Sequence, residues 1–326
     1  MHNDVTRRTF LAALSASTAG VLTGGLPRLM AAIPEASSSG ETFLLGGDVL
    51  VNRLGFGAMR LTGEGIWGWP PDRENAKKVL RRAVELGVNF IDTADAYGPE
   101  TNELLIAEAL YPYPKGLIIA TKGGQTRPSP GRWEQDGRPE YLSQAVDKSL
   151  KRLKLERIDL WQLHRIDRKV PVEESLGAIK KAQDAGKIRH VGLSEVTVAE
   201  IEQAKKVVPI VSIQNRYNIT DRESEAALNY CEKEKMGFIP WAPIGGGGSH
   251  SLSKASNPLE AEAKRHNVSV VQLALAWLLQ KSPVMLPIPG TSSLAHLEEN
   301  MAAEKLQLSA DEWKRIESLG RPHGIL

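Results

Sequence analysis

The stretch NFIDTADAYG (89–98) decides the fold of this chain. Its first half, residues 89–94, is a short apolar run typical of a strand buried on both faces of a parallel sheet, and polar residues follow where that strand would end. Similar runs recur along the chain. The predicted strands cover residues 55–59, 89–94, 117–122, 158–164, 188–194, 211–216, 237–243 and 284–290.

Helical patterns separate these runs. In the first, Asp72 is a suitable N-cap and Gly87 suits a left-handed C-terminal residue, which predicts a helix over 72–86. The remaining predicted helices cover residues 102–110, 139–153, 172–185, 198–207, 222–235, 259–266, 270–280, 294–303 and 310–319.

Alternation of strands and helices predicts a parallel sheet with right-handed crossovers. Eight such units in about 280 residues favour an α/β fold of the closed (β/α)8 TIM-barrel type. No G-x-G-x-x-G follows the first strand, so a dinucleotide-binding Rossmann fold is not indicated. Before the barrel, two apolar runs flank Gly46-Gly47-Asp48, which predicts an N-terminal β-hairpin. We expect residues 41–326 to form one barrel domain.

Residues 1–40 differ from the rest. Arg7 and Arg8 precede a weakly apolar run over 10–26, and residues 33–40 are rich in Pro and Ser. This pattern is typical of a cleavable signal rather than a membrane helix, and paired arginines are typical of the twin-arginine type. We expect handling by the twin-arginine export machinery, no stable membrane span after cleavage, and a periplasmic or other extracytoplasmic location. With a non-functional signal the protein would stay cytoplasmic.

The composition is that of an ordinary soluble domain. The 326 residues are 41% hydrophobic and 25% charged, with a formal net charge of +2. This balance gives no reason to expect a nucleic-acid partner. Cys231 is the single cysteine, which excludes an intramolecular disulfide and a cysteine-based metal site. We expect a monomer without a metal.

Four polar side chains mark the ends of three successive predicted strands. Asp92 and Tyr97 belong to the second strand and the loop after it, Lys122 ends the third, and His164 ends the fourth. Catalytic residues of such barrels come from the carboxyl ends of the strands, so we expect these four to converge. Singly, each has a structural explanation: a buried Lys122–Asp92 ion pair, a core histidine, a loop tyrosine.

Together the four form a reasonable proton-delivery site. A free phenol has a pKa of about 10, and a neighbouring cation such as Lys122 lowers it. Asp92 would hold Lys122 charged, and His164 would either orient a carbonyl group or hydrogen-bond the phenol. No nucleophile or metal is required, so the acid would assist a group transfer such as hydride transfer from a nicotinamide.

Several segments follow one another in a familiar order: IDTADAYG, IIATKGG, DLWQLHRID, VGLSEV, SIQNRYN and IPGTSSLAHLEEN. They resemble segments of the aldo/keto reductases over roughly residues 43–320, and the whole set is similar to the bacterial branch that reduces pyridoxal. The resemblance implies that Tyr97 is the general acid and that Asp92, Lys122 and His164 complete a catalytic tetrad.

The resemblance also implies NADPH bound across the barrel mouth. The matching positions are Gly57, Met59, Ser194, Gln214, Trp241, Ala242, Ile244, Gly246, Gly290, Thr291, Ser292, His296, Glu299 and Asn300. Amides and hydroxyls near residue 291 at a helix start suit an anion. Two positions depart from the family pattern: Glu195 replaces a usual asparagine and Trp241 a usual tyrosine. No Arg or Lys occurs over 291–299, so use of NADH beside NADPH is expected.

The expected substrate is a small carbonyl compound. Trp67 and Trp69 match positions that line the pocket of family members, and Trp133 lies in the polar loop after the third strand. Aromatic side chains favour an apolar or aromatic aldehyde or ketone, with a pyridoxal-like aldehyde as one candidate. The short segment 321–326 after the last helix predicts an open site. A nucleotide-binding sensor or scaffold with little turnover remains the alternative.

Overall fold

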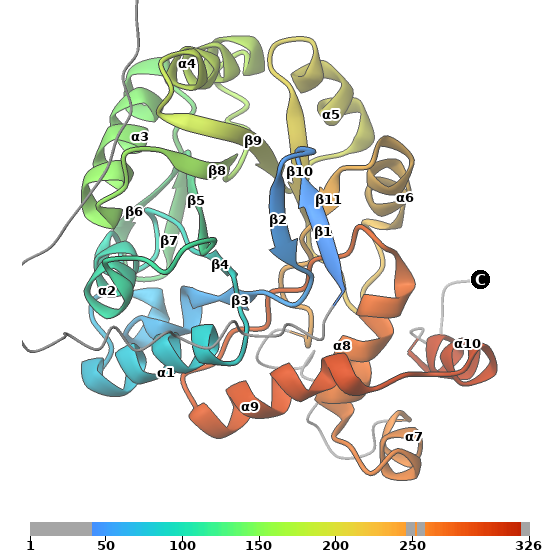
Figure 1. Cartoon of the computed structure of the whole chain (residues 1–326). Coiled ribbons are helices and arrows are strands. Elements are labelled where there is room, and N and C mark those ends of the chain that lie inside the picture. Colours follow the sequence, from blue (N-terminus) through green and yellow to red (C-terminus); the bar gives the residue numbers. More distant parts are fainter. Residues whose placement is uncertain (1–40, 246–251, 253–257, 321–326) are drawn as a thin grey trace, which may run out of the picture. The chain divides into compact units, whose positions relative to one another are not determined.

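The computed structural model describes residues 41–245, 252 and 258–320. The predicted leader (1–40) and Gly246 lie outside the described residues. Figure 1 shows a curled sheet with helices around its outside. The seven parallel strands, in spatial order β11-β10-β9-β8-β5-β4-β3, are β3 (Phe56–Gly57), β4 (Phe90–Asp92), β5 (Ile118–Gly123), β8 (Ile158–Leu163), β9 (Ile188–Ser194), β10 (Ile210–Gln214) and β11 (Gly237–Phe238).

Helices follow the strands as the alternation predicts. The first six are α1 (Arg73–Glu85), α2 (Thr101–Leu110), α3 (Pro139–Leu153), α4 (Val172–Asp184), α5 (Val198–Lys205) and α6 (Glu225–Glu234). The start and end of α1 are as predicted, because Asp72 accepts a hydrogen bond from the Asn75 amide and Gly87 has φ +95°. The later helices are α7 (Glu260–Arg265), α8 (Val270–Lys281), α9 (Leu294–Ala302) and α10 (Ala310–Leu319), with the short 3-10 helix η3 (Ala303–Lys305) between the last two.

The predicted eighth strand, residues 284–290, is not a regular strand. It makes one isolated bridge, between Phe238 and Met285. Pro287 and Pro289 lack the N–H groups that a strand ladder needs. The prediction of a regular strand over these residues was therefore wrong. The segment still hydrogen-bonds with both edge strands: Phe238 exchanges bonds with the segment, and the amides of Gly55 and Gly57 donate to the two proline carbonyls.

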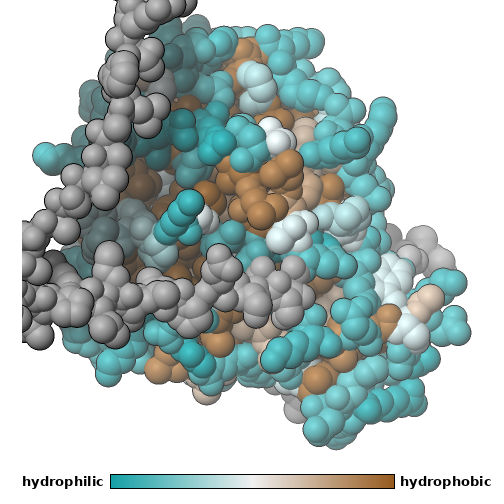
Figure 2. Space-filling view, in the orientation of Figure 1, coloured by the Kyte–Doolittle hydropathy of each residue, from teal (hydrophilic) through white to brown (hydrophobic). Residues whose placement is uncertain are grey.

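An antiparallel pair precedes the parallel sheet. Strands β1 (Thr42–Leu45) and β2 (Val49–Asn52) are joined by residues 46–48. Leu45 and Val51 pack into a hydrophobic cluster with residues from the beginnings of the parallel strands, such as Phe90. The pair therefore covers the amino-terminal end of the sheet (Figure 1). Its outward side carries two exposed leucines, Leu44 and Leu50, and Figure 2 shows hydrophobic surface on this face.

Two short features lie at the other end of the sheet. The loop after β3 contains the 3-10 helices η1 (Ala58–Leu61) and η2 (Glu64–Ile66). The segment after β5, expected to be a loop, forms a second antiparallel pair, β6 (Gln125–Ser129) with β7 (Arg132–Gln135). Both rise beside the carboxyl ends of the strands, where chemistry is expected.

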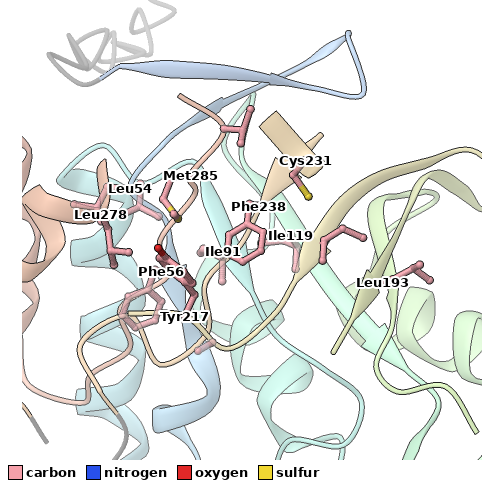
Figure 3. Close-up of a cluster of buried hydrophobic side chains, with 14 of the residues drawn as sticks. Leu54, Phe56, Ile91, Ile119, Leu193, Tyr217, Cys231, Phe238, Leu278 and Met285 are labelled. Atoms are coloured by element: carbon pink, nitrogen blue, oxygen red, sulfur yellow. The ribbon is translucent and has the colours of Figure 1, made fainter. Parts of the chain in front are cut away.

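The period of two along each strand separates two kinds of packing. Ile91 and Ile119 belong to a large cluster between sheet and helices, whereas Phe90 and Ile118 belong to the smaller interior cluster. Figure 3 shows members of the large cluster, among them Leu54, Phe56, Ile91, Ile119, Leu193, Tyr217, Cys231, Phe238, Leu278 and Met285. The alternation thus fixes which residue at each strand end points inward.

The described residues offer neither a helix that could span a membrane nor a cluster of metal ligands. None of their helices has the length and apolar character needed to cross a membrane. Among these residues there is also no group of three or more His, Cys, Asp and Glu side chains arranged to hold a metal ion.

Candidate active site

Inward-facing polar residues cap the interior cluster at the carboxyl ends of the strands. Asp92 is on the same side of β4 as Phe90, Lys122 continues the series of Ile118 and Ala120 in β5, and His164 directly follows β8. Tyr97 reaches them from the loop between β4 and α2. The structure therefore brings the four predicted residues together.

Lys122 is the centre of this group. It is fully buried, and its Nζ donates to Asp92 Oδ1 at 2.6 Å, to the Thr93 carbonyl at 2.7 Å and to the Tyr97 hydroxyl at 3.3 Å. An ammonium has three N–H donors, so all of them are used. Because the Tyr97 oxygen accepts from Lys122, the phenol's own proton must be directed elsewhere, and the open direction is the adjoining cavity.

Burial controls the protonation of the site. The pKa of Tyr97 is raised by desolvation, which outweighs the opposing effect of the Lys122 cation. The sequence-based expectation of a lowered phenol pKa was therefore wrong in its net direction, because burial depth is not visible in the sequence. Desolvation, together with Lys122 and Arg165, lowers the pKa of His164 well below its usual value. At neutral pH the site holds a phenol and a neutral imidazole.

Asp92 is held from its other side by two glutamines. Its Oδ2 accepts from Gln214 Nε2 at 2.8 Å and from Gln162 Nε2 at 3.2 Å. Gln162 was not among the predicted site residues. It lies two residues before His164 on the inner side of β8, so the period of two along that strand was a signal that could have found it.

A cavity of about 460 Å³ opens directly above this group. Many predicted positions line it, including Gly57, Met59, Ser194, Gln214, Trp241, Ala242, Ile244 and Gly290. Its other lining residues are Arg60, Asp92, Tyr97, Ile66, Gln125, Trp133, His164, Arg165, Pro243, Gly245 and Ile288. The volume and the mainly apolar walls with a few polar groups are those of a small-molecule site.

Two polar side chains on the wall form a complementary pair. The amide nitrogen of Gln214 donates to Asp92, so its carbonyl oxygen is left to accept from the cavity. Ser194 Oγ accepts from Arg165 Nη1 at 3.0 Å, so its hydroxyl proton is left to donate. One acceptor beside one donor matches a primary carboxamide.

The remaining predicted positions lie outside this cavity. Thr291, Ser292, His296, Glu299 and Asn300 do not line it. Thr291 and Ser292 lie just before α9, and the other three lie on it; the N-cap Ser293 Oγ accepts from the His296 amide. Asn300 is buried on this helix.

Trp67 and Trp69 are not among the residues that line this cavity, and their contact with substrate stays a prediction. Trp69 is exposed, and the guanidinium of Arg73 stacks 3.6 Å from its ring. Trp67 faces the guanidinium of Arg127 at 5.6 Å. Both rings therefore have a cationic neighbour, which sequence spacing did not indicate.

The family comparison agrees with this geometry. A model of the aldo/keto reductase family matches residues 53–321. The chain belongs to the aldo/keto reductase family. The family predicted from the motifs and its (β/α)8 fold are confirmed, with the seven described parallel strands forming a curled sheet.

Similar proteins are oxidoreductases. An uncharacterized oxidoreductase of Schizosaccharomyces pombe is 50% identical over 287 residues, which cover 88% of this chain and 92% of that protein. Pyridoxine 4-dehydrogenase of Escherichia coli is 42% identical over 289 residues, 87% of this chain and 99% of that protein. The crystal structure of a thermostable aldo-keto reductase with the inhibitor epalrestat is 30% identical, with a TM-score of 0.75, covering 85% of this chain and 99% of that one.

In this aldo/keto reductase, one buried arginine builds the wall beyond Tyr97. Arg127 is 6% exposed, donates to the carbonyls of Ile66 and Gly65 at 3.1 and 2.9 Å, and stacks 3.8 Å from the Trp133 ring. Trp133 in turn meets the rings of Tyr97 and His164 edge-on at 6.5 and 6.3 Å. Arg127 therefore joins the loop after β3 to the β6–β7 pair.

Proposed function

We propose that this protein reduces the carbonyl group of small aldehydes or ketones to alcohols, with NADPH as hydride donor and Tyr97 as proton donor. The observation that carries the proposal is the complete use of the Lys122 donors, which directs the Tyr97 proton into the cavity. A proton donor aimed at a mainly apolar cavity suits protonation of a substrate oxygen.

The cavity fits a nicotinamide. The Ser194 hydroxyl and the Gln214 carbonyl would hold its carboxamide, and the Trp241 indole offers a flat apolar wall for the ring. The His164 imidazole lines the same cavity as Tyr97, so it too would meet a bound group. When bound, the reduced cofactor supplies the hydride. We propose NADPH as the main cofactor, with NADH accepted more weakly.

The chain's own residues manage the proton. Burial keeps Tyr97 protonated until a substrate oxygen accepts the proton, and the Lys122 ammonium then stabilises the phenolate that is left. Asp92 fixes the ammonium at this place. The neutral His164 imidazole carries one N–H, which would donate to the carbonyl oxygen and orient it.

The substrate class follows from the wall and from the relatives. Trp133 and Ile66 are apolar and stand beside Tyr97. A relative 42% identical is named pyridoxine 4-dehydrogenase. We therefore propose aromatic aldehydes, with pyridoxal-like compounds as the first candidates.

The experiment is a panel of aldehydes and ketones, pyridoxal included, with purified protein and NADPH, followed by the loss of reduced nicotinamide. NADPH binding is measured on the same sample. Reduction of at least one aromatic aldehyde supports the proposal. Binding without reduction of any compound would favour the alternative of a nucleotide-binding sensor or scaffold.

Export by the twin-arginine route is a separate proposal, supported by the sequence of residues 1–40 alone. Replacement of Arg7 and Arg8 by lysines followed by cell fractionation tests it. Retention of the variant in the cytoplasm is the expected result, and an unchanged location would contradict the proposal.

A further inference from the structure

The wall opposite Tyr97 is built on a strained backbone. Glu195, directly after β9, has φ +57°, and Ala242, directly after Trp241, has φ +52°. Residues other than glycine rarely adopt this left-handed backbone conformation, and those that do cluster at functional sites. The Glu195 amide donates to the Gln214 carbonyl at 3.0 Å, and the Trp241 amide donates to the Asn215 carbonyl at 3.1 Å.

The strained residue holds the tryptophan. Glu195 Oε1 accepts a hydrogen bond from the indole Nε1 of Trp241 at 2.5 Å and another from the Arg216 amide at 2.8 Å. The Arg216 guanidinium lies 5.5 Å from the centre of the indole ring. The edge of the indole is therefore fixed by a charge-assisted bond, which is shorter and stronger than a neutral one.

Of this pair, only the tryptophan is in contact with the cavity. Trp241 lines the cavity and Glu195 does not. The carboxylate therefore reaches a bound ligand only through the ring that it holds. Glu195 of the segment VGLSEV and Trp241 of the segment IPWAP, 46 residues apart in sequence, thus form one hydrogen-bonded pair.

We propose that Glu195 is a positioning residue that sets the plane of the Trp241 indole for the nicotinamide ring. This inference rests on the proposed function. A surface tryptophan loses rotamer freedom when a ligand fixes it, and a ring that is already fixed loses less. Glu195 thus raises affinity for the nicotinamide cofactor by holding the indole in the binding orientation before binding.

A double-mutant cycle tests the proposal. The variants are Glu195→Ala, Trp241→Phe and the two combined, and the readout is the dissociation constant for NADPH measured by calorimetry. Alanine keeps a Cβ on the strained backbone, so the variant removes the carboxylate without relieving the φ. Phenylalanine keeps a flat ring without an N–H.

We expect Glu195→Ala to weaken NADPH binding roughly five- to tenfold, the scale of one lost hydrogen bond and one freed side chain. In the Trp241→Phe background the same change should have no further effect. Glu195→Gln keeps an acceptor oxygen and is the matched control, with binding close to that of the wild type. Melting temperatures of the variants check that the fold is intact.

A second readout needs no cofactor. The indole N–H resonance of Trp241, identified by its absence in Trp241→Phe, should move upfield in Glu195→Ala and much less in Glu195→Gln. An equal loss of NADPH affinity on removing Glu195 in both backgrounds, or an unmoved indole resonance, would overturn the inference alone. A wild-type protein that binds no NADPH would overturn the proposed function and this positioning role with it.

Discussion

The two ends of the parallel strands use the same kinds of side chain in different ways. At the carboxyl end, His164 is buried beside Lys122 and Asp92 and its Nδ1 has no hydrogen-bond partner among the described residues. At the amino end, His190 in β9 pairs with Asp48 of the β1–β2 turn at 2.5 Å, and Asp48 is half exposed.

The two clusters differ in their burial and in their surroundings. Asp48 also accepts from Arg189 at 2.8 Å, and these bonds lower its pKa and tie the β1–β2 pair to β9. These bonds join two strands at the surface, so the cluster serves the fold. At the carboxyl end, the Lys122–Asp92 ion pair is fully buried, which is costly, and it lies beneath the cavity that Tyr97 and His164 line. A costly buried ion pair beside a cavity is typical of a functional site.

The largest expected effect is the loss of the buried cation. Lys122→Met should lower the rate of aldehyde reduction by about 10²- to 10⁴-fold, because the phenolate of Tyr97 loses its stabilising charge. Steady-state kinetics on purified protein measure it. The variant leaves Asp92 buried without its partner, so Lys122→Met combined with Asp92→Asn is the matched control for stability. Near-normal turnover in either variant would contradict the assigned role.

A second aspartate at the carboxyl end, Asp95, allows the two ends to be compared by varying the pH. Burial, with a contribution from Glu103, raises the pKa of Asp95 to about 8, and its Oδ1 has no partner among the described residues. Asp95 has a pKa of about 4 in the unfolded chain. Between this pH and pH 8 the carboxyl holds a proton in the folded protein but not in the unfolded chain, so stability falls as the pH rises.

Asp95→Asn removes that titration. We expect it to stabilise the protein by about 4 kcal/mol more at pH 9 than at pH 5, because about three pH units between 5 and 8 each cost the wild type about 1.4 kcal/mol. Denaturant titrations at the two pH values measure the difference. A stabilisation of equal size at both values would show that Asp95 does not titrate in this range.

Arg127, which stacks on Trp133 of the cavity wall, should have an intermediate effect. Arg127→Met removes two hydrogen bonds to the loop after β3 and the stack on Trp133, so kcat/KM for bulky aromatic aldehydes should fall about tenfold. The dissociation constant for NADPH should stay unchanged. Arg132→Met, an exposed change on the same β6–β7 pair, is the control. Equal losses in the two variants would remove Arg127 from the substrate wall.

The smallest effect is expected at the amino end. Asp48→Asn should lower stability by less than about 1 kcal/mol at neutral pH, the usual size for an exposed ion pair, and should leave aldehyde reduction unchanged. Because pairing lowers the pKa of Asp48, its contribution is present near neutral pH and is lost as pH falls through that pKa. A clear loss of activity would break the proposed division between the two ends.

The sequence predicted well those features that depend on local patterns, such as apolar runs and residues that interrupt a strand. Short continuous apolar runs placed Asp92, Lys122 and His164 at strand ends, and the period of two along a strand would have added Gln162. Pro287 and Pro289 were visible signs that the eighth segment is irregular.

Other features depend on contacts across long sequence separations. Trp67 lies beside the Arg127 guanidinium, and Glu195 binds Trp241. No local pattern indicates either contact. The raised pKa of Tyr97 depends on burial depth, which outweighs the cation that the sequence did indicate. Such balances are set by the packing of the whole domain.

The most direct test of the account compares binding and turnover in Tyr97→Phe. Phenylalanine keeps the ring that packs against Trp133 and His164 and removes only the hydroxyl. We predict NADPH binding within about threefold of the wild type and a fall in aldehyde reduction of about two to four orders of magnitude. Undiminished reduction by the variant would contradict the assignment of Tyr97 as the proton donor.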